Sequence, residues 1–240
     1  MRKNAIVLCS GGLDSVTTAN YAKKALGYKE VVIMFFDYGQ RTIKQERHYS
    51  KKCAKNLKAE FVEIKLPELK KWSKSLINKK SIIKKIRVID LKDSKEESNK
   101  YYVPCRNTIF LTYALALAES KMINERKIFD ILSGFKCEGS ESYPDTTSEF
   151  VKKINELREE ATSVKGEIKA PLINKDKEDI VTLAKKINVN LKETYSCYAG
   201  TNNNSHCGIC LSCRLRQEGF YWANIEDPTK YLTKLSDFRR

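Results

Sequence analysis

An apolar run near the amino terminus leads directly into a short glycine-containing turn and then into a helical pattern. Residues 5–9 form the apolar run, the turn reads Ser10-Gly11-Gly12-Leu13-Asp14-Ser15, and apolar residues recur at helical spacing over residues 14–26. A buried strand joined to a helix by so short a turn is typical of α/β proteins. The backbone N–H groups of such a turn and the amino terminus of the helix both favour an anion. This segment therefore predicts an α/β fold with a phosphate-binding loop.

The same alternation of strands and helices continues along the chain. We expect further strands at residues 30–36, 60–64 and 128–132, and helices at 43–57, 108–120, 150–160 and 176–188. Because these strands are apolar on both faces, they predict an open parallel sheet with helices on both faces. We expect two parts, an α/β domain over residues 1–190 and a small C-terminal region over 191–240.

Residues at about 65–100 break the alternation and predict an insertion. The chain has a formal net charge of +15, and nine lysines and arginines fall between residues 65 and 87, against the single acid Glu68. Such a segment forms either a surface for anions or nucleic acid, or a solvated face. We favour the solvated face, because lysine far outnumbers arginine there and few aromatic side chains lie between the charges.

The turn after the first strand differs from two familiar phosphate loops. A Walker loop ends in Gly-Lys-Ser or Gly-Lys-Thr, and a dinucleotide-binding loop needs a third glycine. Here the glycines allow close approach of a ligand, the serine hydroxyls add donors, and Asp14 is suited to Mg²⁺. The alternative is an ordinary turn with a Ser or Asp helix cap. The position between a buried strand and an apolar helix favours phosphate binding.

Four of the eight cysteines fall within seventeen residues near the carboxyl terminus. They are Cys197, Cys207, Cys210 and Cys213. Four thiolates at this spacing suit tetrahedral Zn²⁺ in a closed, structural site, which leaves no vacancy for the neighbouring His206. An iron–sulfur cluster and unbound buried cysteines are the alternatives. The other cysteines are scattered, which favours a reducing compartment over a disulfide framework.

The sequence carries no signal for a membrane or for export. It has no run of about 18 apolar residues, the length that a membrane-spanning helix needs. The apolar start is also too short for a signal peptide. We therefore expect a cytoplasmic protein that makes no membrane contact.

The complete turn at residues 10–15 resembles the pyrophosphate loop of the N-type ATP pyrophosphatases, which split ATP between its α and β phosphates. Together with the four-cysteine tail, it resembles the 7-cyano-7-deazaguanine synthase family. Further motifs of that family are matched by Phe-Asp-Tyr-Gly-Gln-Arg at 36–41, Tyr-Val-Pro-Cys-Arg-Asn at 102–107 with Phe110, Tyr-Pro-Asp at 143–145 with Glu149 and Phe150, Pro-Leu at 171–172 and Asp-Lys at 176–177. The resemblance covers nearly the whole chain except the basic insertion, and it implies a fold like that of the adenine nucleotide alpha hydrolases.

The resemblance implies an ATP-dependent ligase that forms carbon–nitrogen bonds. Members of the family convert 7-carboxy-7-deazaguanine and ammonia into a nitrile, the queuosine precursor, through an adenylate and an amide. The implied partners are therefore ATP, the deazaguanine carboxylate and ammonia. A homodimer is also compatible with the sequence. A second possibility is transfer of the activated deazaguanine to another amine, on a protein or a nucleic acid. A tRNA thiolase fits less well, because it needs catalytic cysteines and the clustered thiols are expected to bind a metal. A non-enzymatic nucleic-acid-binding module also fits less well, because it does not explain the phosphate loop.

The resemblance also assigns roles to individual residues. ATP would lie against Ser10, Gly11, Gly12, Leu13, Asp14, Ser15, Gln40 and Arg41. Asp14 would hold Mg²⁺, Arg106 would pair with a phosphate or the substrate carboxylate, and Lys177 would neutralise a phosphate; these three would be catalytic. The deazaguanine side would be formed by Asn107, Tyr143 and Asp145. The alternatives are a solvated lysine, an arginine on a surface loop, and an aspartate that forms a turn or caps a helix.

Three departures from the family pattern fall near the expected substrate. Cys105 stands where the family has a small residue, residues 139–142 replace a slightly longer Asp-x-Ser-Gly segment, and Thr146-Thr147 replace Cys-Arg. These differences bear on the choice of substrate and amine acceptor more than on the use of ATP.

Overall fold

The computed structural model describes residues 3–79, 82–91, 95–136, 143–201, 204–233 and 238. Lys80 of the basic segment lies outside these residues, as does the segment 139–142, which differs from the family pattern. No helix in the described ranges is long and apolar enough to cross a membrane.

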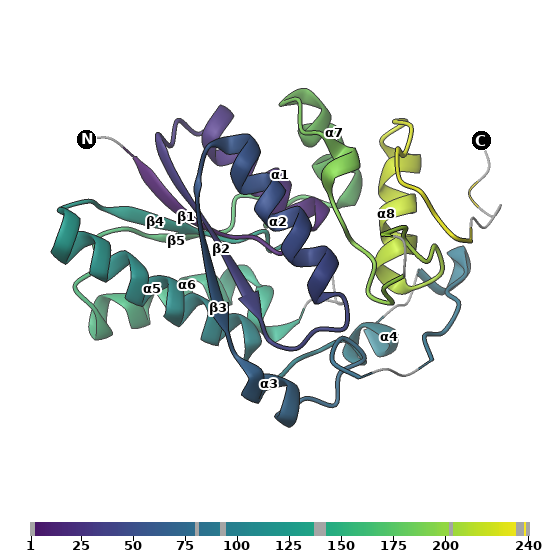
Figure 1. Cartoon of the computed structure of the whole chain (residues 1–240), viewed down its shortest axis with the longest axis horizontal. Helices are drawn as coiled ribbons and strands as arrows, with labels where there is room; N and C mark the ends of the chain where they lie inside the picture. Colours follow the sequence, from purple (N-terminus) through teal and green to yellow (C-terminus); the bar gives the residue numbers. More distant parts are fainter. Residues whose placement is uncertain are drawn as a thin grey trace.

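Five parallel strands form the centre of the described fold (Figure 1). They are β1 (Asn4–Leu8), β2 (Glu30–Asp37), β3 (Glu60–Lys65), β4 (Phe129–Leu132) and β5 (Ile168–Lys169). The order across the sheet is β3-β2-β1-β4-β5, so the order reverses between β1 and β4. Ligands of open parallel sheets bind beyond the carboxyl ends of the strands at such a point. The four expected strands are confirmed to within one residue at each end, whereas β5 is too short to show in the sequence pattern.

Helices cover both faces of the sheet, as the apolar strands predicted (Figure 1). On one face lie α1 (Leu13–Lys24), α2 (Ile43–Leu57) and α7 (Lys177–Lys186), and on the other lie α5 (Arg106–Glu125) and α6 (Ser148–Ala161). Successive residues of a strand point to opposite faces. Accordingly, Ala5 and Val7 of β1 pack into the core beneath α1, α2 and α7, and Ile6 packs into the core beneath α5 and α6. The fold class expected from the sequence is confirmed.

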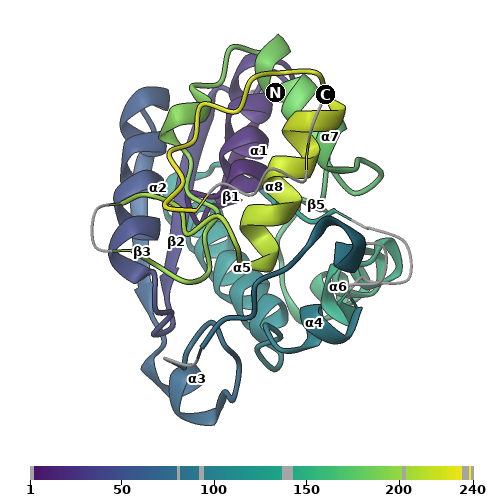
Figure 2. The same ribbon diagram turned by 90° about the vertical axis from the view of Figure 1, so that its right-hand side faces the viewer.

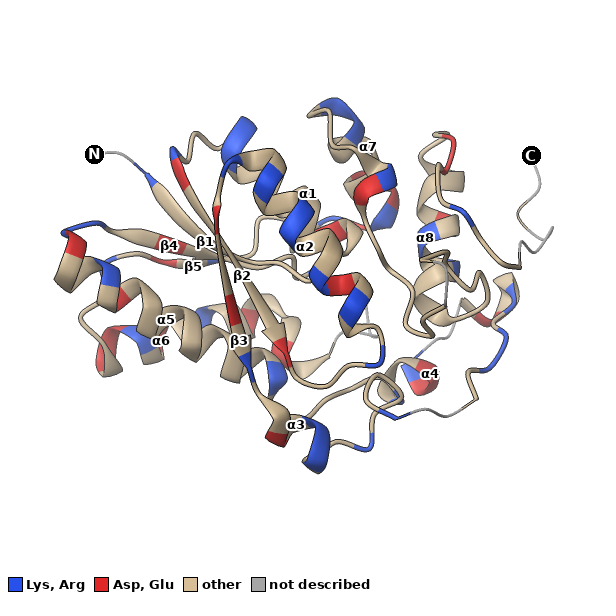
Figure 3. Ribbon diagram, viewed as in Figure 1, with Lys and Arg blue, Asp and Glu red and all other residues tan. Residues whose placement is uncertain are grey.

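The basic insertion folds back onto the domain through its apolar residues. It contains α3 (Pro67–Trp72), a 3₁₀ turn (Val88–Leu91) and α4 (Lys95–Asn99). Leu69, Ile77 and Ile86 are buried in the core, while every described lysine and arginine of 65–87 is exposed. Figure 3 shows this basic stretch along α3 and the loop that follows it. Apolar side chains therefore hold this segment to the domain while its charges face solvent.

The C-terminal region lies beside α7 (Figure 2). It consists of a 3₁₀ turn (Leu191–Glu193), the loop that carries the first cysteines, and α8 (Leu211–Trp222), a helix that we did not expect from the sequence. Gly219 of α8 makes the close contact with α7 possible, because a Cβ at this position would lie 2.3 Å from Cγ of Lys177. The contact places the amino-terminal residue of α7 between α8 and the carboxyl edge of the sheet.

Candidate active site

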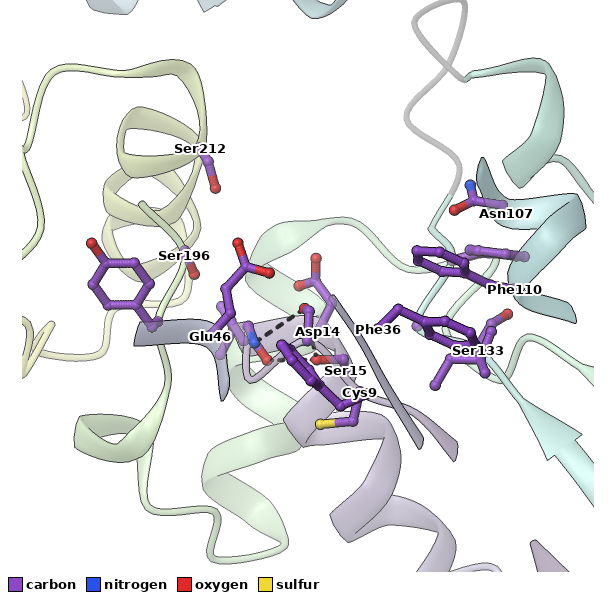
Figure 4. A pocket seen from close by; sticks show the side chains of 18 of the residues that line it. Cys9, Asp14, Ser15, Phe36, Glu46, Asn107, Phe110, Ser133, Ser196 and Ser212 are labelled. Atoms are coloured by element: carbon purple, nitrogen blue, oxygen red, sulfur yellow. Dashed lines mark hydrogen bonds between the residues drawn. The ribbon is translucent and has the colours of Figure 1, made fainter. Parts of the chain in front are cut away.

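A cavity of about 250 Å³ opens beyond the carboxyl ends of β1, β2 and β4. The phosphate loop forms its floor through Ser10, Gly12, Leu13, Asp14 and Ser15. Its walls come from the ends of β2 and β4, from Glu46 of α2, from the start of α5, and from residues 195–198 of the C-terminal region. Figure 4 shows the Asp14 and Glu46 carboxylates on one side of the cavity and the Phe36 and Phe110 rings on the other. The cavity therefore lies where the strand order predicts a ligand site.

The phosphate loop is held by close contacts that only glycine permits. Gly11 has a φ of +80°, and a Cβ there would lie 2.8 Å from the backbone nitrogen of Ser50 on α2. The hydroxyl of Ser50 also donates to the carbonyl of Cys9 at 2.8 Å, which fixes α2 against the end of β1. Within the loop, the hydroxyl of Ser15 donates to the carbonyl of Gly12 at 3.2 Å, and the oxygens of Ser10 and Ser15 lie 3.4 Å apart. The loop is thus preformed, with two hydroxyls and the α1 amino terminus at the cavity.

Asp14 and Lys177 form an ion pair on the cavity wall. Nζ of Lys177 lies 2.8 Å from both carboxylate oxygens of Asp14. Burial raises the pKa of Asp14, but the charges of Lys177 and Lys136 outweigh it and hold this pKa below its ordinary value. Two residues expected to share the phosphate site are therefore brought together from segments 163 residues apart in the sequence.

Lys136 is a third charged residue at this place, and our sequence analysis did not single it out. It follows β4, and burial together with the charge of Lys177 lowers its pKa to about 7. Nothing in a lysine-rich sequence distinguishes this lysine from the others. Its position two residues after Gly134, which lies close to the amino terminus of α1, is a property of the folded sheet.

Glu46 is another residue of the cavity wall that the sequence analysis missed. It lies in the first turn of α2, where its carboxylate accepts hydrogen bonds from the Thr42 hydroxyl and from Nε2 of Gln40. Burial raises the pKa of Glu46 above the ordinary carboxyl value, against the effect of these hydrogen bonds. One signal was available, because Glu46 is the single acidic residue in the helix expected at 43–57.

Arg106 and Asn107 both line the cavity at the start of α5. Nε of Arg106 donates to Oδ1 of Asn107 at 3.1 Å, and its guanidinium lies over the Tyr38 ring at 5.8 Å from the ring centre. Cys105, the residue before them, has a φ of +55° and is exposed. The left-handed region favours glycine, so this conformation costs Cys105 more than it would cost a glycine.

Apart from Gly11, four of the expected ligand-binding residues are not among those that line the cavity. Gln40 is buried beneath it and uses its amide to hold Phe36, Tyr38 and Glu46, while Arg41 points to the carbonyl of Lys79. Asp145 is buried, and its Oδ2 accepts from the N–H of Asn107 at 3.3 Å. The hydroxyl of Tyr143 donates to the carbonyl of Ser98 at 2.8 Å. These contacts support the walls of the site.

An aromatic cluster forms the wall opposite the carboxylates. The rings of Phe36 and Phe110 are stacked, with centres 3.9 Å apart and an angle of 4° between the planes, and Tyr38 meets Phe110 edge-on at 5.5 Å. All three side chains line the cavity. Flat aromatic surfaces of this kind favour planar heterocycles.

The four clustered cysteines form a second site beside the cavity. Their sulfur atoms all lie within 4.8 Å of one another, and those of Cys207 and Cys213 are 3.8 Å apart. A tetrahedral zinc with Zn–S distances of about 2.3 Å requires sulfur atoms about 3.8 Å apart, so the group fits Zn²⁺. Backbone N–H groups of Cys207 and Cys210 lie 3.3 Å from cysteine sulfurs, a contact that favours thiolates. The arrangement confirms a four-thiolate group that can hold a metal.

The cysteine site and the phosphate loop are joined directly. The N–H of Tyr195 donates to the carbonyl of Gly11 at 2.8 Å, and Tyr195 and Cys197 both line the cavity. His206 is buried beside the cysteines and accepts the N–H of Ser196 at 2.9 Å through Nε2, so it positions the loop that carries Cys197. His206 is therefore no metal ligand in this arrangement, as expected from the four thiolates, and it supports the cysteine site through this hydrogen bond.

A doubly wound sheet with a preformed anion loop and a carboxylate–lysine pair at its switch point defines a nucleotide-binding α/β protein. The chain belongs to the family described as queuosine biosynthesis protein QueC, whose model matches residues 4–224.

Several relatives match the chain over nearly its whole length. A 7-cyano-7-deazaguanine synthase of Methanosphaera stadtmanae is 38% identical over 235 residues, covering 96% of this chain and 99% of that protein. The 7-cyano-7-deazaguanine synthase of Methanocaldococcus jannaschii is 40% identical over 236 residues, with 95% and 99% covered. That of Rickettsia akari is 36% identical over 235 residues, with 96% and 100% covered. Among solved structures, an NMN synthetase from Francisella tularensis matches with a TM-score of 0.40 and 12% identity over 93% of this chain and 84% of that one, a likeness too remote to support an inference.

Proposed function

We propose that the protein is an ATP-dependent 7-cyano-7-deazaguanine synthase, which joins 7-carboxy-7-deazaguanine and ammonia to give the nitrile. The observation that carries the proposal is the meeting of the serine- and glycine-rich loop with Asp14 and Lys177 at the switch point of the sheet. The near full-length similarity to proteins that bear this name supports the choice of substrate.

ATP lies with its phosphates on the loop at residues 10–15. The hydroxyls of Ser10 and Ser15 and the N–H groups at the start of α1 donate to the phosphate oxygens. Mg²⁺, when bound, neutralises charge on the phosphates, and the Asp14 carboxylate is the oxygen ligand that suits it. Lys177 then turns from Asp14 to a phosphate, so the ion pair of the free protein is a resting arrangement.

The first chemical step is adenylation of the deazaguanine carboxylate. One carboxylate oxygen attacks the α-phosphorus of ATP, a new phosphorus–oxygen bond forms, and pyrophosphate leaves. Arg106 and Lys177 neutralise the anions that must approach one another. No covalent bond to the protein is required, and the residues act by positioning and by charge.

The walls of the cavity orient the planar parts of the substrates. Phe36, Tyr38 and Phe110 offer the aromatic surface for a heterocycle, and Asn107 offers an amide beside it. Gln40 and Arg41 shape the nucleotide side, and Tyr143 and Asp145 hold the start of α5, which carries Arg106. Most of these residues belong to the α/β domain at residues 1–190, and residues 195–198 of the C-terminal region complete the cavity wall.

Residues 191–240 supply the structural zinc site, which Cys197, Cys207, Cys210 and Cys213 hold. The four thiolates leave no open position, so the metal stabilises the fold and takes no part in the reaction. Thiolates of this kind persist in a reducing compartment, which supports a cytoplasmic location for the enzyme. Transfer to an amine on a macromolecule has no specific observation in its favour among the described residues.

The proposal is tested by isotope exchange between labelled pyrophosphate and ATP. The full-length protein should catalyse exchange only when 7-carboxy-7-deazaguanine and Mg²⁺ are present, and without any ammonia. Lack of exchange with this acid, or exchange that does not depend on it, would overturn the proposal.

A further inference from the structure

Glu46 is placed between the phosphate loop and the start of α5, and the chemistry proposed above gives it no role. The turn of α2 that carries it touches the loop, because a Cβ on Gly11 would lie 2.9 Å from the carbonyl oxygen of Glu46. Its carboxylate lines the same cavity as Asp14 and Arg106 (Figure 4). Glu46 therefore shares a cavity with the residues proposed to hold ATP and the substrate acid.

The charges around the cavity distinguish Glu46 from Asp14. Among the described lining residues, four side chains carry charge: Asp14, Glu46, Arg106 and Lys177. Asp14 accepts Lys177 on both oxygens. Glu46 instead accepts from two neutral groups, the Thr42 hydroxyl and the Gln40 amide, one on each oxygen. A carboxylate offers about four acceptor positions, so Glu46 has acceptor positions left for a cation.

The proposed reaction needs a group that binds a small cation and takes a proton from it. Ammonia is a basic amine and, like the lysine amine with its pKa of about 10.4, is protonated at neutral pH. The ammonium ion has no lone pair and cannot attack a carbonyl carbon. We propose that Glu46 binds the ammonium ion in the cavity and takes its proton, so that ammonia is released beside the adenylated carboxylate. The inference rests on the proposed function.

The step balances as follows. The Glu46 carboxylate takes one proton from ammonium, and the nitrogen lone pair attacks the adenylated carbonyl carbon to form the carbon–nitrogen bond. The bond from that carbon to the AMP oxygen breaks, and AMP leaves with the electron pair. A second proton leaves the nitrogen as the adduct collapses and is taken by the departing phosphate, and Glu46 returns its proton to water.

The other charged and titratable groups that face Glu46 are Arg106 on α5, Asp37 at the end of β2, and Tyr38 after it. Burial is the largest influence on Glu46 and raises its pKa, with Asp37 acting in the same direction and Arg106 against it. A carboxylate with a raised pKa is a stronger base than an ordinary one, as a proton acceptor should be.

The experiment separates adenylation from amine transfer in Glu46→Gln. Pyrophosphate exchange, which needs no amine, should stay within about threefold of the unmodified protein, whereas ammonium-dependent amide and nitrile formation should fall about 100-fold or more. Hydroxylamine is a much weaker base and is unprotonated at neutral pH, so hydroxamate formation should also stay within about threefold of normal. Glu68→Gln, the same change on an exposed side chain, should alter none of the three rates.

A pH profile gives a second readout that a purely structural role would not move. In the unmodified protein, kcat/KM for total ammonium should be flat above the pKa of Glu46, because the carboxylate binds ammonium itself. In Glu46→Gln it should rise about tenfold per pH unit, following the free ammonia. If the ammonium and hydroxylamine reactions fall together, or if the pH profiles coincide, Glu46 is not the proton acceptor. If the unmodified protein shows no exchange at all, it is the proposed function that fails.

Discussion

Nζ of Lys177 bridges the two carboxylate oxygens of Asp14 at 2.8 Å each, and thereby ties the amino terminus of α7 to the phosphate loop. The lysine side chain is 12% exposed and the aspartate side chain 26%. An ion pair this enclosed holds the phosphate loop in place. In the proposed reaction, Asp14 also serves Mg²⁺ and Lys177 a phosphate of ATP. Stability and activity therefore depend on the same contact and have to be separated by experiment.

Replacing Asp14 with Asn should lower turnover about 100-fold or more, because the charge that suits Mg²⁺ is lost. It should also lower the free energy of unfolding by about 1–3 kcal/mol, since Lys177 is left without its partner in a partly enclosed place. Steady-state rates and urea unfolding measure the two effects.

The double variant Asp14→Asn with Lys177→Met separates stability from activity. Removing the unpaired charge should recover most of the lost stability and none of the activity. Normal turnover in either variant would contradict the proposed role of this pair.

Replacing Cys210 with Ser should cause loss of the metal and unfolding or aggregation, rather than a change in rate alone. The four thiolates join the Cys197 loop to α8, and the metal binding energy is part of the folding energy. Elemental analysis should find one zinc per chain in the unmodified protein. Iron in place of zinc, or a folded, metal-free Cys210→Ser protein, would show that this account of the site is wrong.

Asp145 should act through the start of α5. Asp145→Ala removes the acceptor for the buried N–H of Asn107, which should cost about 1–3 kcal/mol in unfolding free energy. Asp145→Asn keeps an acceptor oxygen and should retain both stability and deazaguanine affinity. Calorimetric titration with the deazaguanine distinguishes this supporting role from direct contact. If a stable Asp145→Asn protein loses affinity for the deazaguanine alone, the Asp145 carboxylate contacts the substrate.

Lys136 predicts a particular pH dependence of stability. Burial and the charge of Lys177 lower its pKa to about 7, while a lysine in the unfolded chain has a pKa of about 10.4. Between these values the unfolded chain binds more protons, so this group makes stability rise with pH. Unfolding free energies at pH 7, 8 and 9 should therefore rise less in Lys136→Met than in the unmodified protein. Lys165→Met, at an exposed lysine, is the matched control, and parallel curves for all three proteins would refute the prediction.

The fold was largely predictable because its main elements have strong local patterns. The strands at β1 and β2 are continuous apolar runs, and α2 begins and ends where its spacing predicts. By contrast, α8 was missed because its sequence carries a cysteine that belongs to the zinc site, two arginines, and a glycine that serves the contact with α7. Tertiary contacts determine such a helix more than its propensity does.

The site was predictable in its chemistry and less so in its geometry. The loop at residues 10–15, Arg106 and Lys177 meet at one cavity as expected, whereas Gln40 and Asp145 lie behind its walls. Sequence motifs reveal that a residue belongs to a site, but they do not separate a residue that touches the ligand from one that holds its neighbour. Lys136 went unnoticed because its environment is created by elements distant in the sequence, and Glu46 because only the fold brings it to the same cavity as Asp14 and Arg106.

The central claim is tested most directly by mass analysis of the product formed from 7-carboxy-7-deazaguanine, ATP, Mg²⁺ and ¹⁵N-labelled ammonium. The account predicts 7-cyano-7-deazaguanine that carries one ¹⁵N atom in the nitrile, accompanied by AMP and pyrophosphate. Formation of ADP in place of AMP, or the absence of labelled amide and nitrile from a folded, zinc-loaded protein, would contradict it.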